Sequence, residues 1–190
     1  DERLYRILEK QKKEYTLTIC GRDGKDQTYQ IGSLIELIWG IENPAAIINK
    51  IADKNIHIIT LTITEGGYNI AKATNEFMLD NENIKYDLAH PQSPKTTFGF
   101  VAEGLRKRKA VGNGPITILS CDNLQHNGNT ARKAFLSFFQ AQDPELAEWA
   151  TVNITFPNSM VDRITPSTQP EDIIRLNTQN GTQDGAPVYC

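Results

Sequence analysis

Polar residues gather directly behind three apolar, strand-like runs of the chain. The stretches are TEGGYN (64–69), SCDNLQHNG (120–128) and PNSMVDRITP (157–166). Ligands of open parallel sheets bind beyond the carboxyl ends of the strands, so carboxamides, hydroxyls and carboxylates placed there could hold a small ligand. The glycines of the first stretch would let a ligand approach the backbone closely. Taken singly, each residue is more typical of a loop or a helix cap, and only the coincidence of three such ends favours a site.

Motifs that would define a reaction are absent from the sequence. The one GxG, at 112–114, precedes a strand, whereas a dinucleotide fingerprint needs strand, glycines and helix in that order, so a turn is predicted. No P-loop, HExxH or GxSxG occurs, and the three widely spaced cysteines indicate neither a zinc site nor a disulfide framework. Of the three histidines only His126 follows a strand end, and we expect it to be solvated.

Composition and charge are those of an ordinary soluble domain. The 190 residues are 39% hydrophobic and 23% charged, with a net charge of −3, which points to no polyanionic partner such as a nucleic acid. The basic run at 106–109 lies in a helical pattern and is predicted to be a solvated face. No apolar run approaches the roughly 18 residues of a membrane span. Together with the odd cysteine count, these features predict a cytoplasmic protein.

Helix-like and strand-like segments alternate along the chain. Strands are expected at 16–20, 28–40, 57–63, 115–119 and 152–156. Helices are expected around 4–8, after Pro44, around 98–105, around 131–138, from Pro144 to Trp149 and after Pro170. The first two strands flank a turn rich in glycine and aspartate, which predicts a β-hairpin, and the run 57–63 predicts a strand buried on both faces. The alternation favours an α/β fold: a mostly parallel sheet with helices on both faces, plus the N-terminal hairpin.

Three strings resemble, in order, the polyol dehydrogenase family that contains mannitol 2-dehydrogenase and fructuronate reductase. They are TLTITEGGYN, PITILSCDNLQHNGNTARKA and TFPNSMVDRITPSTQPEDI, and with a weaker EYTL opening they span nearly the whole chain. The resemblance implies that residues 1–190 are the greater part of a Rossmann-like nucleotide-binding domain. We expect its first Gly-rich βα unit and the C-terminal helical catalytic domain to lie outside this truncated chain. The family's catalytic lysine, in a K-x4-N-x2-H motif, has no match here.

The resemblance also implies roles for individual residues. Asn123 matches an asparagine that stabilises the substrate oxygen as it gains negative charge, a task suited to a neutral amide donor. Glu65 matches a glutamate that takes part in proton and water traffic near the lysine. Asp162 matches a position near the polyol hydroxyls, with Arg163 as its companion. Further residues are expected along the cofactor, the last of them near the adenosine ribose: Thr64, Ser120, Cys121, Asp122 and Asp1. No metal ligand set is expected.

The implied activity is a metal-independent oxidoreduction that uses NAD, with NADP as the open alternative. It would interconvert a secondary alcohol of a polyol or sugar acid and its ketone, of the mannitol/fructose or mannonate/fructuronate type. Without the lysine that acts as general base, we expect the isolated chain to be inactive. A non-catalytic Rossmann-like ligand-binding or regulatory module remains an alternative. A kinase or transferase is a weaker one, because the P-loop is absent.

Overall fold

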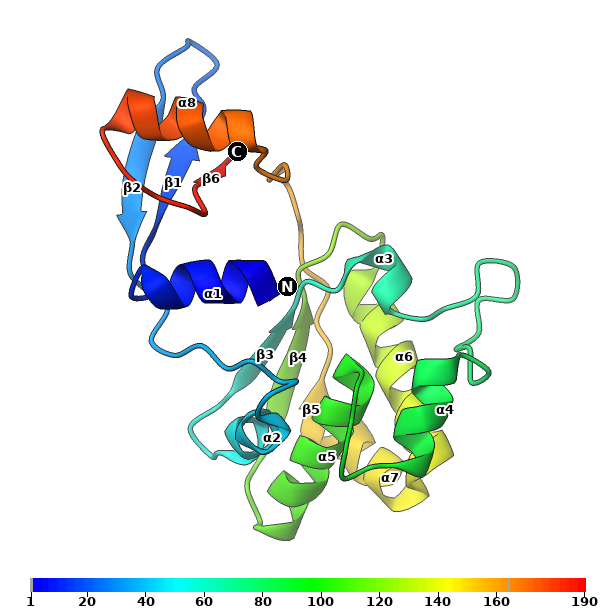
Figure 1. Cartoon of the computed structure of the whole chain (residues 1–190). Helices are drawn as coiled ribbons and strands as arrows, with labels where there is room; N and C mark the ends of the chain where they lie inside the picture. The colour runs from blue at the N-terminus through cyan, green and yellow to red at the C-terminus, as the bar shows by residue number, and fades with distance from the viewer. Residues whose placement is uncertain (1, 164) are drawn as a thin grey trace. The chain divides into compact units, whose positions relative to one another are not determined.

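The computed structural model describes residues 2–163 and 165–190 (Figure 1). The predicted ribose contact of Asp1 therefore lies outside the described residues. The chain divides into two compact units, one formed by Asp1–Trp39 with Asp162–Cys190 and the other by Gly40–Val161. Each unit has its own three-stranded sheet. No helix in the described ranges is long and apolar enough to cross a bilayer.

The sheet of the first unit has the strand order β2-β1-β6. β1 (Tyr15–Ile19) and β2 (Gln27–Ile31) form the predicted antiparallel hairpin. The second strand is shorter than predicted, because it ends at Ile31 whereas the sequence run continues to Gly40. The third strand, β6 (Val188–Tyr189), pairs in parallel with β1 and was not predicted, since two residues carry no recognisable period.

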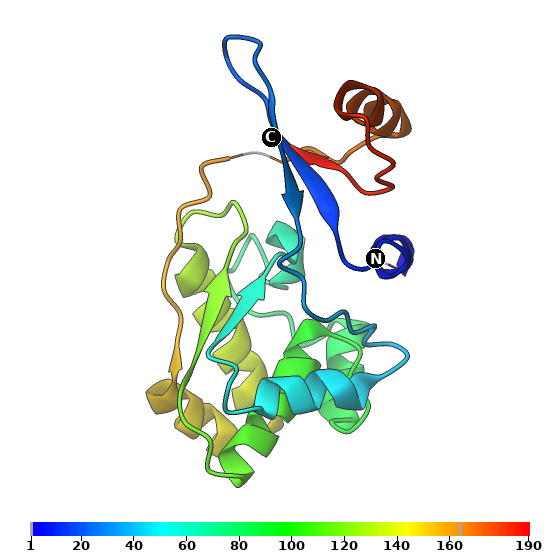
Figure 2. The same ribbon diagram turned by 90° about the vertical axis from the view of Figure 1, so that its left-hand side faces the viewer.

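Two helices accompany this sheet, and both are predicted from the sequence. α1 (Glu2–Lys10) buries Leu8, and α8 (Pro170–Asn180) begins at a proline and ends before Gly181, whose φ is 65°. Proline at the first helical position and glycine just past the last one are typical helix boundaries. Figure 2 shows both helices on the same side of the hairpin.

The sheet of the second unit is wholly parallel and confirms the predicted α/β class. β3 (Ile58–Leu61), β4 (Ile116–Ser120) and β5 (Ile154–Thr155) lie in the order β3-β4-β5. Six helices of the described chain belong to it: α2 (Pro44–Ala52), α3 (Thr64–Gly67), α4 (Glu82–Ala89), α5 (Thr97–Ala110), α6 (Asn127–Gln142) and α7 (Pro144–Asn153). Figure 1 shows α5, α6 and α7 packed beside the strands.

The core of this unit packs against one face of the sheet. Ile116 and Ile118 of β4 are buried there with Phe98 of α5 and with Phe135, Phe138 and Phe139 of α6. The prediction that the run 57–63 is buried on both faces is wrong for the described residues. β3 lies at an edge of this sheet, and Ile58 is 54% exposed while Leu61 is 4% exposed.

The basic run 106–109 contains a buried residue, so the prediction of a solvated face is wrong at Arg108. Its side chain is 1% exposed, and burial lowers its pKa. The guanidinium donates to the carbonyl oxygens of Gly114 at 2.7 Å, Asp53 at 2.7 Å and Ile51 at 3.1 Å. Arg108 thus joins the end of α2 to the turn that leads into β4. The planar guanidinium, with five N–H donors, suits such a junction of carbonyl groups.

Candidate active site

The three polar stretches begin at the carboxyl ends of β3, β4 and β5, as the sequence predicts. The first folds into the short helix α3, the second forms the loop between β4 and α6, and the third leaves β5 and returns to the start of α6. Residues 64–69, 120–128 and 157–161 all belong to the second unit and are joined by hydrogen bonds. The edge of the sheet is therefore a single connected arrangement of loops.

β3 leaves the sheet through a residue in the left-handed region. Thr64 has φ of 66°, and the preceding Ile63 has φ of −105° and ψ of 3°. A β-branched residue at positive φ is a genuine outlier, and such strain persists only where the surroundings impose it. The carboxylate of Asp122 supplies this constraint, since it accepts hydrogen bonds from the backbone N–H of Ile63 at 3.1 Å and of Thr64 at 2.9 Å.

A buried tyrosine completes the surroundings of this carboxylate. The hydroxyl of Tyr68 lies 2.7 Å from Oδ2 of Asp122 and 2.6 Å from Oγ of Ser120. Tyr68 and Ser120 are fully buried and Asp122 is 8% exposed. Burial raises the pKa of Tyr68 well above its ordinary value, and hydrogen bonding and charge from Asp122 add to this, so the phenol stays neutral and can donate. The side chains of Ser120 and Asp122 are thus engaged within the protein.

Asn127 connects the loop after β4 with the loop after β5. It is 1% exposed; its Oδ1 accepts from Ser159 N at 2.9 Å, and its Nδ2 donates to Ser159 O at 3.0 Å and Asp122 O at 3.2 Å. Ser159 Oγ in turn donates to Ser120 O at 2.5 Å. Its Oδ1 also accepts from Gly128 N at 2.8 Å, so the carboxamide serves the first turn of α6, as a cap residue does, and also holds two loops together.

The start of α6 is also capped from the loop after β5. Oδ1 of Asn158 accepts from Gly128 N at 2.9 Å and from Asn129 N at 3.3 Å. A Cβ at Gly128 would lie 2.3 Å from the carbonyl oxygen of Pro157, so only glycine allows this approach. Asn158 thus caps this helix although it lies 29 residues from Asn129 in the sequence.

Other predicted residues face solvent at the same edge. Thr64, Glu65 and Asn123 are exposed, and Cys121 is half-buried. Oε1 of Glu65 lies 3.2 Å from Nζ of Lys72. A cavity of about 370 Å³ lies here, and its lining includes Glu65, Gly66, Lys72, Leu124 and Gln125. A Cβ built on Gly66 would have no neighbour within 4 Å, so the backbone there is open to a ligand. Carboxylate and carboxamide groups can thus reach a small polar molecule.

Asp162 and Arg163 belong to the other unit, so their predicted substrate contacts stay predictions. Nη1 of Arg163 donates to Sγ of Cys190 at 3.5 Å. Among the described residues, no group of three or more His, Cys, Asp and Glu side chains could hold a metal ion.

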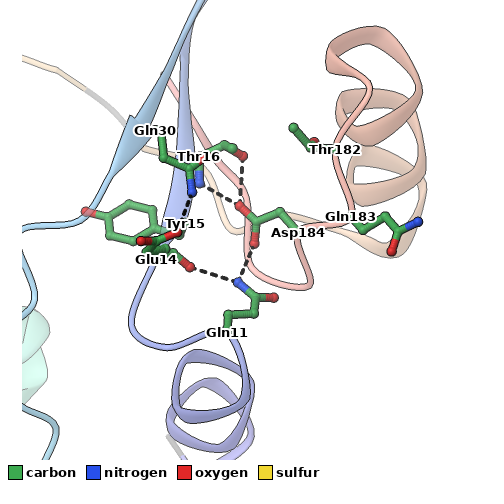
Figure 3. Close-up of a pocket in the computed structure, with 8 residues that line it drawn as sticks. All are labelled: Gln11, Glu14, Tyr15, Thr16, Gln30, Thr182, Gln183 and Asp184. Carbon is green, nitrogen blue, oxygen red and sulfur yellow. Dashed lines mark hydrogen bonds between the residues drawn. The ribbon is translucent and has the colours of Figure 1, made fainter.

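A separate cavity, of about 310 Å³, lies in the first unit (Figure 3). Its most buried carboxylate is that of Asp184, which is 7% exposed. It accepts from Thr16 N at 2.6 Å, Thr16 Oγ1 at 2.8 Å, Gln11 Nε2 at 2.9 Å and Ala186 N at 2.8 Å. Because both oxygens already have two donors, Asp184 joins the α1–β1 turn to the segment before β6.

Sequence reasoning missed Tyr68, Asn127 and Ser159 as parts of the edge. Each stands inside or beside a predicted polar stretch, which is the only signal the sequence offers. Each of the three has a hydrogen-bond partner 32 to 54 residues away, and no local spacing encodes such pairing.

Comparison with known proteins gives consistent similarities. The sequence profile of the mannitol dehydrogenase Rossmann domain matches residues 2–190. A polyol:NADP oxidoreductase of Gluconobacter oxydans is 46% identical over 176 residues, which are 93% of this chain and 36% of that protein. The crystal structure of a D-sorbitol dehydrogenase in substrate-free form superposes with a TM-score of 0.96 at 43% identity, over 99% of this chain and 39% of that one.

A mannitol 2-dehydrogenase of Pseudomonas fluorescens, solved as a ternary complex with NAD and D-mannitol, has a TM-score of 0.95 at 41% identity. The match covers 100% of this chain and 39% of that one. The chain thus spans well under half the length of these relatives.

Proposed function

Because the chain belongs to the mannitol dehydrogenase family through its match to that family's Rossmann domain, we propose that the protein is an NAD(P)-dependent oxidoreductase. It interconverts a secondary alcohol of a polyol or sugar acid and the corresponding ketone. The observation that carries the proposal is the carboxyl edge of the parallel sheet, where buried hydrogen bonds fix the loops and leave Asn123 and Glu65 exposed. Dinucleotides bind at this edge in Rossmann-type sheets.

The residues at the edge fit a nicotinamide cofactor. The backbone is open at Gly66, which allows a planar ring to approach. The exposed Thr64 and the half-buried Cys121 follow the carboxyl ends of β3 and β4. When bound, the cofactor supplies the hydride chemistry, while the protein binds, orients and polarises. We assign Thr64 and Cys121 to cofactor contact; Ser120 is proposed to act through its backbone, because its side chain is buried. A ternary complex with NAD and a polyol:NADP oxidoreductase among the similar proteins support NAD, with NADP as the alternative.

Asn123 is proposed to donate its side-chain N–H to the substrate oxygen as negative charge develops there. A neutral amide held by a fixed loop needs no reorganisation when the charge appears. Glu65 is proposed to accept and pass on the proton released from the substrate hydroxyl. Asp162 and Arg163 are proposed to bind the other hydroxyls or a carboxylate of the substrate. The general base of the related enzymes, a lysine motif, is absent from this sequence, so we expect no turnover from the 190-residue chain alone.

The partner is proposed to be a small polyol or sugar acid, in line with the D-mannitol named for the Pseudomonas fluorescens complex. A cytoplasmic location is proposed as well, supported by the free cysteines Cys20, Cys121 and Cys190, which are typical of a reducing compartment.

The proposal is tested with the full-length natural protein. NAD or NADP is added with D-mannitol or with a sugar acid, and nicotinamide absorbance is followed. Substrate-dependent reduction or oxidation of the cofactor is the expected result. Tight cofactor binding with no turnover on any polyol or sugar acid would instead favour the alternative of a non-catalytic ligand-binding module.

A further inference from the structure

We infer that Asp122 is a positioning residue of the proposed dehydrogenase site, which holds Thr64 in its left-handed conformation and thereby fixes where Glu65 lies. This inference rests on the proposed function for its meaning in catalysis. It replaces the prediction that Asp122 contacts the cofactor.

The backbone of Thr64 is strained. A threonine at φ of 66° places Cβ close to its own backbone, and the free residue would prefer an extended conformation. In that conformation β3 would continue in its own direction instead of turning into α3. An external constraint must therefore act on this peptide, and Asp122 makes direct hydrogen bonds to it.

Both oxygens of the Asp122 carboxylate accept hydrogen bonds from within the protein. Oδ1 accepts from Thr64 N at 2.9 Å, and Oδ2 accepts from Ile63 N at 3.1 Å and from the hydroxyl of Tyr68 at 2.7 Å. The residue is 8% exposed. A carboxylate with three internal donors and almost no exposed surface is suited to hold a loop, not to bind a ribose hydroxyl or an amide from solvent.

Glu65 directly follows the strained Thr64, so the conformation of Thr64 decides where Glu65 lies. The backbone turn at Thr64 directs the start of α3, and Glu65 stands in its first turn with its carboxylate 3.2 Å from Nζ of Lys72. A different φ at Thr64 would swing the Glu65 side chain away from the cavity that it lines. Displacement of a reacting group by about 1 Å can lower a rate about a hundredfold.

The chain offers a matched control in Asp87. This carboxylate is fully buried, and like Asp122 it accepts from two backbone N–H groups and one hydroxyl: Lys95 N at 2.8 Å, Thr96 N at 2.8 Å and Thr96 Oγ1 at 2.6 Å. It holds the start of α5 and contacts none of the residues proposed for the site. Asp87→Asn therefore reproduces the loss of a buried carboxylate without touching Thr64.

The experiment compares Asp122→Asn, Asp87→Asn, Thr64→Asn and the double variant Thr64→Asn/Asp122→Asn in the full-length protein. Steady-state kinetics give kcat and the KM for the cofactor, and hydrogen exchange reports on the amides of Ile63 and Thr64. We expect Asp122→Asn to lower kcat by about tenfold to a hundredfold and to leave the cofactor KM within about twofold. Asp87→Asn should leave kcat within about twofold at a temperature where both variants are folded.

Two further measurements distinguish a positioning role of Asp122 from a general loss of stability. Exchange at Ile63 and Thr64 should accelerate in Asp122→Asn and not in Asp87→Asn, because only the first variant replaces one of the two oxygens that accept from these amides with an NH2 donor. Asparagine adopts the left-handed region far more readily than threonine, so Asp122→Asn should cost less kcat in the Thr64→Asn background than in the natural protein.

The contrary outcomes are equally specific. A large rise in cofactor KM with unchanged kcat would show that Asp122 binds the cofactor and would overturn the inference. Equal losses of kcat in Asp122→Asn and Asp87→Asn would also overturn the inference, because they would show that both variants act through a general loss of stability. If the natural protein turns over no substrate, the proposed function fails; the hydrogen exchange of Ile63 and Thr64 then still decides whether Asp122 holds this peptide.

Discussion

The side-chain Nδ2 of Asn127 donates to the backbone oxygen of Asp122 at 3.2 Å, which ties the first turn of α6 to the loop that carries Asn123. The same carboxamide holds Ser159, and Asp122 holds Thr64, so the ends of three strands share one buried set of hydrogen bonds. Such a set stabilises the loops and specifies their geometry, because every member has partners. Exposed groups on these loops are thereby presented in fixed positions.

Asn127→Ala should lower the free energy of unfolding by about 2–3 kcal/mol, because Ser159 N and Asp122 O would remain buried without this partner. Urea unfolding followed by circular dichroism measures the change. Asn129→Ala is the matched control: this asparagine is exposed at the same helix end, and its loss should change stability by less than about 0.5 kcal/mol. Equal effects of the two variants would contradict the structural role of Asn127.

Arg108→Met should destabilise the protein by about 2–4 kcal/mol, since the carbonyl groups of Ile51, Asp53 and Gly114 would lose their donor in a buried position. Methionine preserves much of the side-chain volume, so the loss reports on hydrogen bonding. Lys107→Met in the same basic run is the control. Its side chain is exposed and bonds Asn49, and we expect a change below about 1 kcal/mol. Thermal unfolding of both variants distinguishes a buried arginine from a solvated face.

Tyr68→Phe should lower the free energy of unfolding by about 1–2 kcal/mol, which is the contribution of a buried hydroxyl bonded to Asp122 and Ser120. It should also change the response to alkali. The pKa of Tyr68 is raised in the folded protein by burial, so its contribution is fully present below the unfolded value of 10.0 and is lost as the pH rises toward the folded value.

The melting temperature of the natural protein should therefore fall more steeply above about pH 10 than that of Tyr68→Phe. Tyr29→Phe, at an exposed tyrosine, is the control for the loss of a phenol hydroxyl. Parallel alkaline profiles for the natural protein and Tyr68→Phe would contradict the burial of an un-ionised phenol.

Gly128→Ala should destabilise the protein by about 2 kcal/mol or more, because the new Cβ would lie 2.3 Å from the carbonyl oxygen of Pro157, which is rigid backbone. Gly114→Ala, where no atom lies within 4 Å of the added Cβ, provides the comparison and should be nearly neutral. If the two substitutions have equal effects on the melting temperature, the close approach of α6 to the loop after β5 is not present in solution.

The sequence predicts the elements well where local chemistry decides them. Asn43 caps α2 and Asp143 caps α7, each with proline following, and both helices begin where these signals indicate. The hairpin and the parallel strands are likewise predicted from turn residues and β-branched runs. These features depend on neighbours a few residues away, which the sequence displays directly.

Features set by distant partners could not be predicted in the same way. β6 pairs with β1 across some 170 residues, and the burial of Arg108 depends on carbonyl groups of another helix and a turn. At the site, the polar residues that follow each strand in the sequence indicate where chemistry could occur. Only the structure distinguishes Asp122, whose oxygens are occupied internally, from the exposed Asn123 that follows it.

The central claim is that Asn123 stabilises the charge that develops on the substrate oxygen. Its most direct test is kcat of Asn123→Ala in the full-length protein, beside Asn129→Ala as a control with an exposed asparagine six residues away. We predict a fall of about tenfold to a thousandfold for Asn123→Ala and none for the control, as expected when one donor to a developing oxyanion is lost. An unchanged kcat for Asn123→Ala would contradict the account.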